Sequence, residues 1–246
     1  MRVVVTGGAG FLGSALVKAL VSRGDQVRVL DNSYRGSVKK LGTYINKIEF
    51  IEADIRDRDA VFRATEGVDA VCHLAFINGT ELFYKIPEQV LDVGIKGAIN
   101  TLEACYEHGV GDYILASSSE VYQSANTIPT DETEMLSIPD SRNPRYSYAG
   151  GKLISEILAF NYGRNKFNRT VVFRPHNVYG PDMGNEHVIP QFIQRLGGKI
   201  LQQPEGIIDF EIQGEGTETR AFNYIDDFIQ GLLLVIDKGV DQNIYH

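Results

Sequence analysis

The chain has 246 residues, of which 43% are hydrophobic and 23% are charged. These fractions are typical of a globular protein and exclude a collagen-like, low-complexity or disordered chain. The 24 basic and 32 acidic side chains give a formal net charge of −8, which argues against nucleic acid or an anionic membrane as the main partner. An acidic protein can still bind a phosphorylated ligand through helix N-termini and a few placed Arg or Lys side chains.

Several other classes of protein are also excluded. No apolar run reaches the roughly 18 residues of a membrane span. The two cysteines, Cys72 and Cys105, are too few for a disulfide framework and are predicted to be core residues. The five histidines show no metal-ligand spacing, so no metal site is predicted. The N-terminus superficially resembles a signal peptide, but its glycines suit a tight turn better, and we expect a cytoplasmic protein.

Predicted strands and helices alternate as far as Arg174. Short runs of strand-forming residues predict strands at Arg2–Thr6, Gln26–Leu30, Ile48–Ala53, Ala70–Ala75, Asp112–Ser117 and Thr170–Arg174. Apolar residues at helical spacing predict helices from Leu12 towards Gly24 and over Asp57–Thr65, Pro87–His108 and Tyr148–Tyr162. This alternation predicts an α/β fold, a doubly wound parallel sheet with ligands bound at the carboxyl ends of its strands.

The pattern weakens after Arg174. Glycines and prolines interrupt short segments there, which predicts a smaller, loop-rich region over residues 175–246. A helix over Asp226–Asp237 is expected to pack back on the first region. The sequence stops at Asn243–His246, which reads as the start of a further strand, and we expect the chain to be truncated.

A glycine-rich loop separates the first strand from the first helix. Thr6–Gly13 reads T-G-x-x-G-x-x-G. In this motif Gly7 allows the sharp turn, Gly10 lets the backbone approach a pyrophosphate, and Gly13 lets the helix pack on the strand. The motif, with strand before and helix after, predicts a Rossmann-type dinucleotide site.

An acidic residue follows at the spacing that this fingerprint needs. Asp31 ends the second strand, where its carboxylate can accept hydrogen bonds from both ribose hydroxyls of NAD. Arg35 nearby would be compatible with NADP, although NAD is the preferred cofactor. The alternative interpretation of Asp31 is a solvated turn residue. Two further pairs follow strand ends: Asp54 and Ile55 are expected to contact the adenine, and Leu74 and Ala75 to let the cofactor pass closely.

Tyr148 and Lys152 are four residues apart in a predicted helix and therefore share one face. A tyrosine with a pKa near 10 is a poor base at neutral pH, but a fixed ammonium and a positive nicotinamide ring each favour the phenolate. Such a phenolate can take a proton from a substrate hydroxyl while a hydride leaves. Ser118, after the fifth strand, could bond the same oxygen. The alternatives are that Tyr148 and Lys152 form a solvent-facing pair on the helix, and that Ser118 belongs to a loop without a catalytic role.

These motifs occur in order with several others: HLA at His73–Ala75, SSSEVY at Ser117–Tyr122, YAGGK at Tyr148–Lys152, RPHNVYGP at Arg174–Pro181 and TRAFNYIDD at Thr219–Asp227. Together the sequence resembles the extended short-chain dehydrogenase/reductase family, in its nucleotide-sugar epimerase/dehydratase branch, over essentially the whole chain. The resemblance implies tightly bound NAD, transient oxidation of the sugar at C4, acidification of C5, and return of the hydride.

The resemblance also implies a role for each matching residue. Tyr148 is the base, Lys152 binds the nicotinamide ribose and tunes Tyr148, and Ser118 is the hydroxyl partner. Asn177 and Ser119 contact the nucleotide sugar, and Arg220 pairs with a phosphate. The implied cofactor-binding residues are Gly7, Gly10, Phe11, Leu12, Gly13, Asp31, Asn32, Asp54, Ile55, Leu74, Ala75, Ser117, Tyr148, Lys152 and Pro175. Residues 1–174 would form the NAD-binding catalytic domain and residues 175–246 part of a nucleotide-sugar-binding region.

The reaction itself is left open. Glu120 resembles the glutamate that acts near C5 in family dehydratases and uronate decarboxylases, but the same triplet occurs in epimerases, and Glu120 could instead be structural. A decarboxylase is therefore an alternative, as is a reductase or dehydrogenase acting on a non-sugar alcohol; a dinucleotide-sensing regulator is a third interpretation. The resemblance further suggests a homodimer formed by a four-helix bundle of Pro87–His108 and Tyr148–Tyr162. Two positions depart from the family pattern: Gly94 replaces a common Asn, and Phe76 replaces a common Ala.

Overall fold

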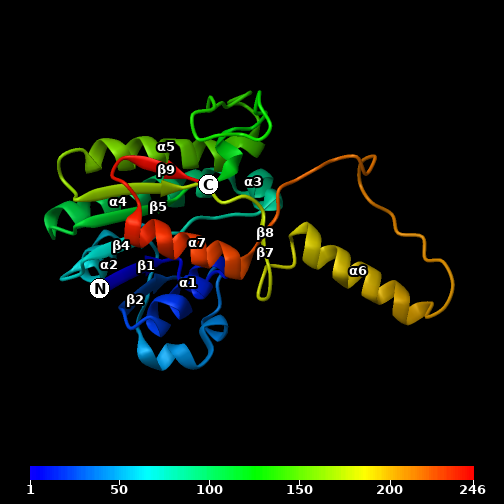
Figure 1. The fold of residues 1–246 in the computed structure, drawn as a ribbon, viewed down its shortest axis with the longest axis horizontal. Coiled ribbons are helices and arrows are strands. Elements are labelled where there is room, and N and C mark those ends of the chain that lie inside the picture. Colours follow the sequence, from blue (N-terminus) through cyan, green and yellow to red (C-terminus); the bar gives the residue numbers. More distant parts are fainter.

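A parallel sheet of seven strands forms the centre of the molecule. The computed structural model describes residues 1–246, and the sheet has the strand order β3-β2-β1-β4-β5-β6-β9 (Figure 1). Every neighbouring pair is parallel. The strands are β1 (Arg2–Thr6), β2 (Gln26–Asp31), β3 (Glu49–Glu52), β4 (Ala70–His73), β5 (Asp112–Ala116), β6 (Arg169–Phe173) and β9 (Asn243–Tyr245). The strand order reverses between β1 and β4, the position at which doubly wound sheets bind ligands.

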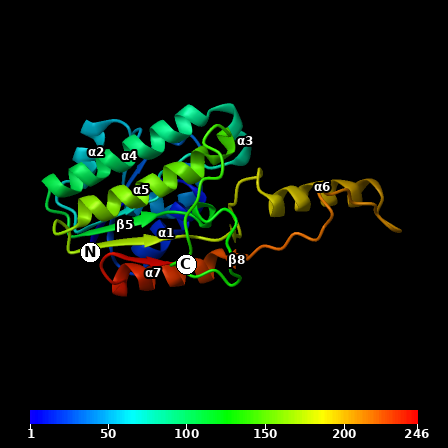
Figure 2. The ribbon, with the colours of Figure 1, turned by 90° about the horizontal axis from the view of Figure 1, so that it is seen from above.

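Helices cover both faces of this sheet (Figure 2). On one face lie α1 (Phe11–Ser22) and α7 (Ile225–Lys238), and on the other lie α2 (Arg58–Thr65), α4 (Pro87–Glu107) and α5 (Ser147–Gly163). Shorter elements are α3 (Thr80–Lys85) and the 3₁₀ segments Val38–Lys47, Ser119–Val121 and Pro144–Tyr146. The two-layer cover confirms the predicted doubly wound α/β fold.

The core follows from the two-residue period of the strands. Val3 and Val5 of β1 face α1 and α7, whereas Val4 between them faces the opposite helix layer. Leu232 of α7 belongs to the same core cluster as Val3 and Val5, so the last helix packs back on the sheet. Cys72 and Cys105 are both fully buried, as predicted.

The six predicted strands are confirmed with end-point differences of at most two residues, and β9 confirms the strand expected at Asn243. One long element was not predicted: α6 (Val188–Gln202), which projects away from the sheet (Figure 1). Gly197 and Gly198 in its middle favoured a loop over a helix in the sequence. None of its residues is buried, and the coil after it returns to a two-stranded pair of β7 (Val178–Tyr179) and β8 (Asn223–Tyr224).

None of these helices combines the length and the apolar character that crossing a bilayer requires. The division of the chain at residue 174 stays a prediction.

Candidate active site

The glycine-rich loop turns tightly at the carboxyl end of β1. Gly7 has a positive φ of 72°, and a Cβ there would lie 2.8 Å from the amide nitrogen of Ala75. A Cβ on Gly13 would overlap the carbonyl oxygen of Gly7. The loop ends at Gly10, the N-cap of α1. Because no side chain intervenes, the backbone is open to close approach by an anion at the helix N-terminus.

Thr6 connects the two strands on either side of this switch point. Its Oγ1 accepts hydrogen bonds from the backbone nitrogens of Leu74 and Ala75, both at 3.2 Å, and lies 2.8 Å from Nδ1 of His73. Burial lowers the pKa of His73 to about 3, so its imidazole is neutral at physiological pH. The Leu74–Ala75 segment is thereby held against the glycine loop.

Asp31 lies at the end of β2 and is 8% exposed. Its Oδ2 accepts from the backbone nitrogen of Ala9 at 2.9 Å, and its Oδ1 accepts from that of Ser33 at 2.8 Å. Burial raises its pKa, and these hydrogen bonds work in the opposite direction. Asp31 is therefore no solvated turn residue; it braces the glycine loop and keeps lone pairs towards the cavity. Arg35 forms an ion pair with Glu186.

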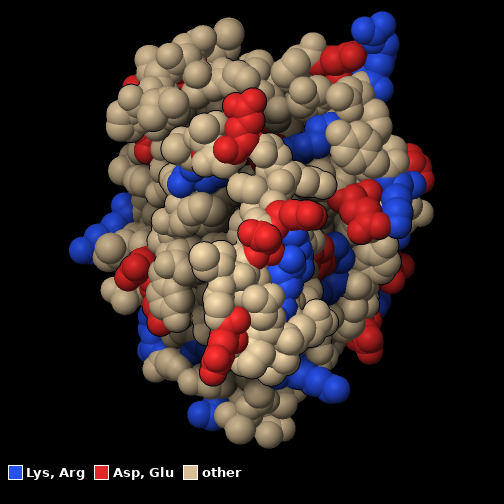
Figure 3. Space-filling model, turned by 90° about the vertical axis from the view of Figure 1, so that its right-hand side faces the viewer, with Lys and Arg blue, Asp and Glu red and all other residues tan.

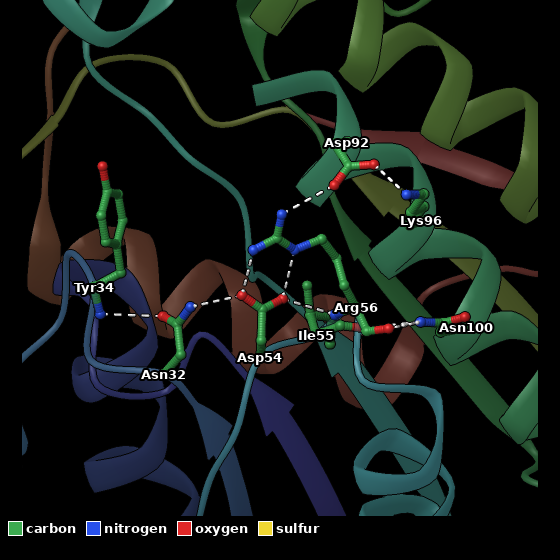
Figure 4. Close-up of polar contacts among 8 residues, drawn as sticks. All are labelled: Asn32, Tyr34, Asp54, Ile55, Arg56, Asp92, Lys96 and Asn100. Atoms are coloured by element: carbon green, nitrogen blue, oxygen red, sulfur yellow. Dashed lines mark hydrogen bonds and ion pairs between the residues drawn. The ribbon is translucent and has the colours of Figure 1, made fainter. Parts of the chain in front are cut away.

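Asp54, after β3, is the centre of a surface network (Figure 4). Arg56 donates to Oδ1 from Nε at 2.9 Å and to Oδ2 from Nη2 at 2.8 Å. The backbone nitrogen of Arg56 also donates to Oδ1, and Asn32 donates to Oδ2 at 3.1 Å. Arg56 continues to Asp92, 2.9 Å away, and is the main reason that the pKa of Asp54 falls to about 2. All four lone pairs of this carboxylate thus have donors within the chain.

Tyr148 and Lys152 occupy the first turns of α5 and are 7% and 3% exposed. Nζ of Lys152 donates to the carbonyl oxygen of Ala116 at 2.7 Å. Burial lowers the pKa of Lys152 to about 7, while the charge of Glu156 raises it. Burial also raises the pKa of Tyr148; a hydrogen bond with Ser118 opposes this rise. The pair is buried, so it is no solvent-facing helix pair.

Ser118 and Glu120 form a short turn directly after β5. Oγ of Ser118 accepts from the backbone nitrogen of Glu120 at 3.2 Å. Both carboxylate oxygens of Glu120 accept from Nη2 of Arg145, at 2.9 and 2.8 Å. The charge of Glu120 adds to the raised pKa of Tyr148. Arg145 was missed in the sequence because nothing in its local pattern marks it as the partner of a residue in another loop.

One cavity of about 580 Å³ joins these parts. It runs from the glycine loop past Asp31 and Asp54 to Tyr148, Lys152 and Asn177. Every site residue expected from the sequence lines it except Arg220, which is exposed and donates to the carbonyl oxygen of Thr219. Asn177 donates from Nδ2 to the carbonyl oxygen of Ala221 at 2.9 Å. On the face from which α6 projects, acidic and basic side chains are interspersed (Figure 3).

The fold and this cavity define a dinucleotide-dependent enzyme class, and the comparisons specify the family. The family model described as "NAD dependent epimerase/dehydratase family" matches residues 3–246. The chain belongs to this family, which confirms the resemblance inferred from its motifs. Its homologues are nucleotide-sugar epimerases, dehydratases and decarboxylases.

Individual relatives illustrate the range of activities in the family. A UDP-N-acetyl-alpha-D-glucosaminuronate decarboxylase of Bacillus cytotoxicus is 32% identical over 246 residues, which are 99% of this chain and 73% of that protein. The dTDP-glucose 4,6-dehydratase of Streptomyces venezuelae, solved with NAD, superposes with a TM-score of 0.86 at 30% identity, covering 100% of this chain and 75% of that one. The UDP-glucose 4-epimerase of Thermotoga maritima, solved with UDP-glucose, gives 0.86 at 28% identity, covering 100% and 76%. The chain thus spans about three quarters of each of these relatives.

Proposed function

We propose that this protein binds NAD and changes the sugar of a nucleotide sugar through transient oxidation at C4. A single observation carries the proposal: one cavity brings together a glycine cradle, an acidic residue at the end of β2, and the group of Tyr148, Lys152 and Ser118. The cradle serves a dinucleotide pyrophosphate, and the buried hydroxyl and ammonium groups serve proton transfer.

The residues of the cradle fit NAD. Gly7, Gly10 and Gly13 leave the N-terminus of α1 uncovered, and Asp31 can accept from the ribose hydroxyls with the lone pairs that Ala9 and Ser33 leave free. A 2′-phosphate beside Asp31 would be repelled, which favours NAD over NADP. When bound, NAD supplies the acceptor for the hydride from C4. The adenine amino group can reach the Asp54 carboxylate only if a donor such as Asn32 gives way.

Tyr148 is the base that accepts the proton of the C4 hydroxyl, with Ser118 sharing that proton. The chain alone holds the pKa of Tyr148 above its usual range, because burial outweighs the Ser118 hydrogen bond. Lys152 contributes positive charge on the same helix face, with Nζ 5.7 Å from the Tyr148 ring centroid. The proton transfer therefore depends on Lys152 being charged.

Glu120 favours a reaction at C5 after the oxidation at C4. Its carboxylate lines the cavity and is paired with Arg145. A carboxylate in this place can remove a proton from C5 once C4 is a ketone, as a dehydratase requires. Decarboxylation is the second candidate, because a uronate decarboxylase is among the relatives and releases its carboxylate from the same carbon.

We test the proposal by solvent deuterium exchange on a panel of nucleotide sugars, followed by NMR. A dehydratase incorporates deuterium at C5, an epimerase interconverts the C4 configurations without it, and a decarboxylase releases CO₂ from a uronate. Glu120→Gln should lower C5 exchange by about 10²- to 10⁴-fold, the range of one acid–base group. Glu88→Gln, on an exposed carboxylate of α4, is the matched control. Absence of all three outcomes and of bound dinucleotide would refute the proposal.

The nucleotide-sugar diphosphate is proposed to contact Asn177 and Arg220, of which only Asn177 lines the cavity in this structure. A homodimer is proposed to form through α4 and α5. Their outer faces carry apolar side chains, among them Ile154 and Ile157, the latter 54% exposed. A cytoplasmic location also stays a prediction.

A further inference from the structure

Phe76 lies at the carboxyl end of β4, on the cavity wall, in a place prepared by two glycines. A Cβ on Gly94 of α4 would overlap the tip of its ring, and a Cβ on Gly151 of α5 would lie 2.8 Å from its Cζ. The helical backbone does not require glycine at either position, since neither glycine has a positive φ and alanine would fit the helix equally well. The absence of a side chain at these two positions therefore leaves the space between α4 and α5 that the Phe76 ring occupies.

The Phe76 ring contacts both members of the catalytic pair. Nζ of Lys152 is 4.2 Å from its centroid, and the Tyr148 ring meets it edge to face at 5.2 Å and 85°. The Tyr148 ring is stacked on its other side by Phe83, at 4.9 Å and 14°. Phe76 therefore touches both the ammonium of Lys152 and the phenol of Tyr148, whereas Phe83 touches the phenol and the guanidinium of Arg145.

We propose that Phe76 is a positioning residue, which holds the ammonium of Lys152 in place beside the phenol of Tyr148. The proposal rests on the proposed function for what the pair does, and on Gly94 and Gly151 for why the ring can reach it. The negative face of an aromatic ring attracts a cation, and the attraction is largest where water is excluded. Lys152 meets both conditions: its Nζ lies over the Phe76 ring, and its side chain is almost fully buried.

The other groups around Lys152 do not by themselves fix its pKa, so a contribution from Phe76 should be detectable. Burial lowers the pKa of Lys152, and the charge of Glu156, one turn further along α5, raises it. That charge is shared with Arg174, the residue directly after β6, whose Nη2 lies 2.7 Å from Glu156. On β4, His73 is kept neutral by its burial.

Three further groups complete the environment of Lys152. From β5 comes the carbonyl oxygen of Ala116, which accepts from Nζ of Lys152, and beyond Tyr148 lie Glu120 and Arg145, paired with each other. The turn of α4 packed against this site contributes Gly94 and apolar side chains, none of which titrates. No full unpaired negative charge faces the ammonium, so the loss of one aromatic face should be measurable.

The test measures the pKa of Lys152 directly, from the ¹³Cε shift of labelled lysine, assigned with Lys152→Met. Phe76→Leu keeps an apolar side chain but removes the aromatic face, and should lower this pKa by about one unit. Phe83→Leu is the control: it removes the ring stacked on Tyr148 without touching Lys152, and should leave the value unchanged. An unchanged or raised pKa in Phe76→Leu would overturn the proposal. This measurement needs no substrate, so its result is separate from the fate of the proposed function.

Turnover gives a second readout. Lys152 has to be charged, so the alkaline limb of the kcat profile should move about one pH unit lower in Phe76→Leu, which is a tenfold loss on that limb and little change on its acid side. A uniform loss at all pH values would indicate a merely structural role and contradict the proposal.

The glycine seat is tested by a double-mutant cycle. Gly94→Ala should displace the ring and lower both Tm and the pKa of Lys152. In a Phe76→Ala background the same added methyl group enters the vacated space, so its effect on Tm should largely vanish. Equal effects of Gly94→Ala in the two backgrounds would show that the ring does not occupy this seat.

Discussion

The sheet with its helices and the arm over residues 183–222 differ in how their positions are fixed. Strands β1 and β4 are almost wholly buried, and their carboxyl ends carry the glycine loop and the Leu74–Ala75 segment. In the arm, α6 buries none of its residues, and Leu201 is 87% exposed. Core packing therefore holds the candidate cofactor-binding and catalytic residues in register. The arm has polar contacts with the rest of the chain near its two ends, where Glu186 pairs with Arg35 and Ala221 accepts from Asn177.

The side-chain contacts of α6 itself are local. Arg195 of α6 donates to the carbonyl oxygen of Glu211, and Nζ of Lys199 donates to that of Asp209 at 2.6 Å. Each joins the helix to the coil that follows it, and neither reaches the sheet. The comparison suggests that substitutions in the sheet region change chemistry or stability, whereas substitutions in the arm change only substrate affinity.

Tyr148→Phe should give the largest effect. The variant keeps the ring that stacks on Phe83 and loses only the hydroxyl, so turnover should fall by about 10³-fold while dinucleotide binding is retained. Steady-state turnover and the dinucleotide released on denaturation measure the two quantities. Retention of more than a tenth of the turnover would remove Tyr148 from the mechanism.

His73 provides a second test of the buried region, through stability. Its folded pKa is near 3, below the value of about 6.5 in an unfolded chain, so between these values only the unfolded imidazole takes up a proton. Stability should therefore fall as pH drops below 6.5, by roughly 2 kcal/mol at pH 5 from this group. Urea unfolding at pH 7 and pH 5 should show a smaller difference for His73→Gln. Equal differences in the two proteins would mean that His73 does not titrate on unfolding.

Arg220→Ala should give the smallest effect and tests the arm. The proposed charge-assisted contact to a phosphate would be removed, so KM for the nucleotide sugar should rise about tenfold, with kcat and dinucleotide affinity little changed. Arg195→Ala, in the same arm, is the matched control. If both variants raise KM equally, the arm rather than Arg220 is responsible; if neither does, Arg220 makes no such contact.

The same contrast explains what the sequence could predict. The glycine loop, Asp31 and the Tyr148–Lys152 pair are recognisable because their spacing is fixed by one strand, one turn or one helix. The roles of Arg56 and Arg145 depend on partners that the local sequence does not show. Likewise, Phe76 was visible only as a departure from the family pattern; its contact with Gly94 and Gly151 depends on how two helices cross. Arg220 was matched by motif alone, and packing does not carry it to the cavity.

The saturated carboxylate of Asp54 has a consequence for cofactor exchange. Arg56 and Asn32 already donate to both oxygens of this carboxylate. A purine amino group that hydrogen-bonds to Asp54 therefore has to displace one of these existing hydrogen bonds. Binding of the base at Asp54 then exchanges one hydrogen bond for another. This exchange adds little net affinity, but it discriminates against bases that cannot form the replacement hydrogen bond. Tenacious retention of the dinucleotide would have to originate at its pyrophosphate and nicotinamide portions instead.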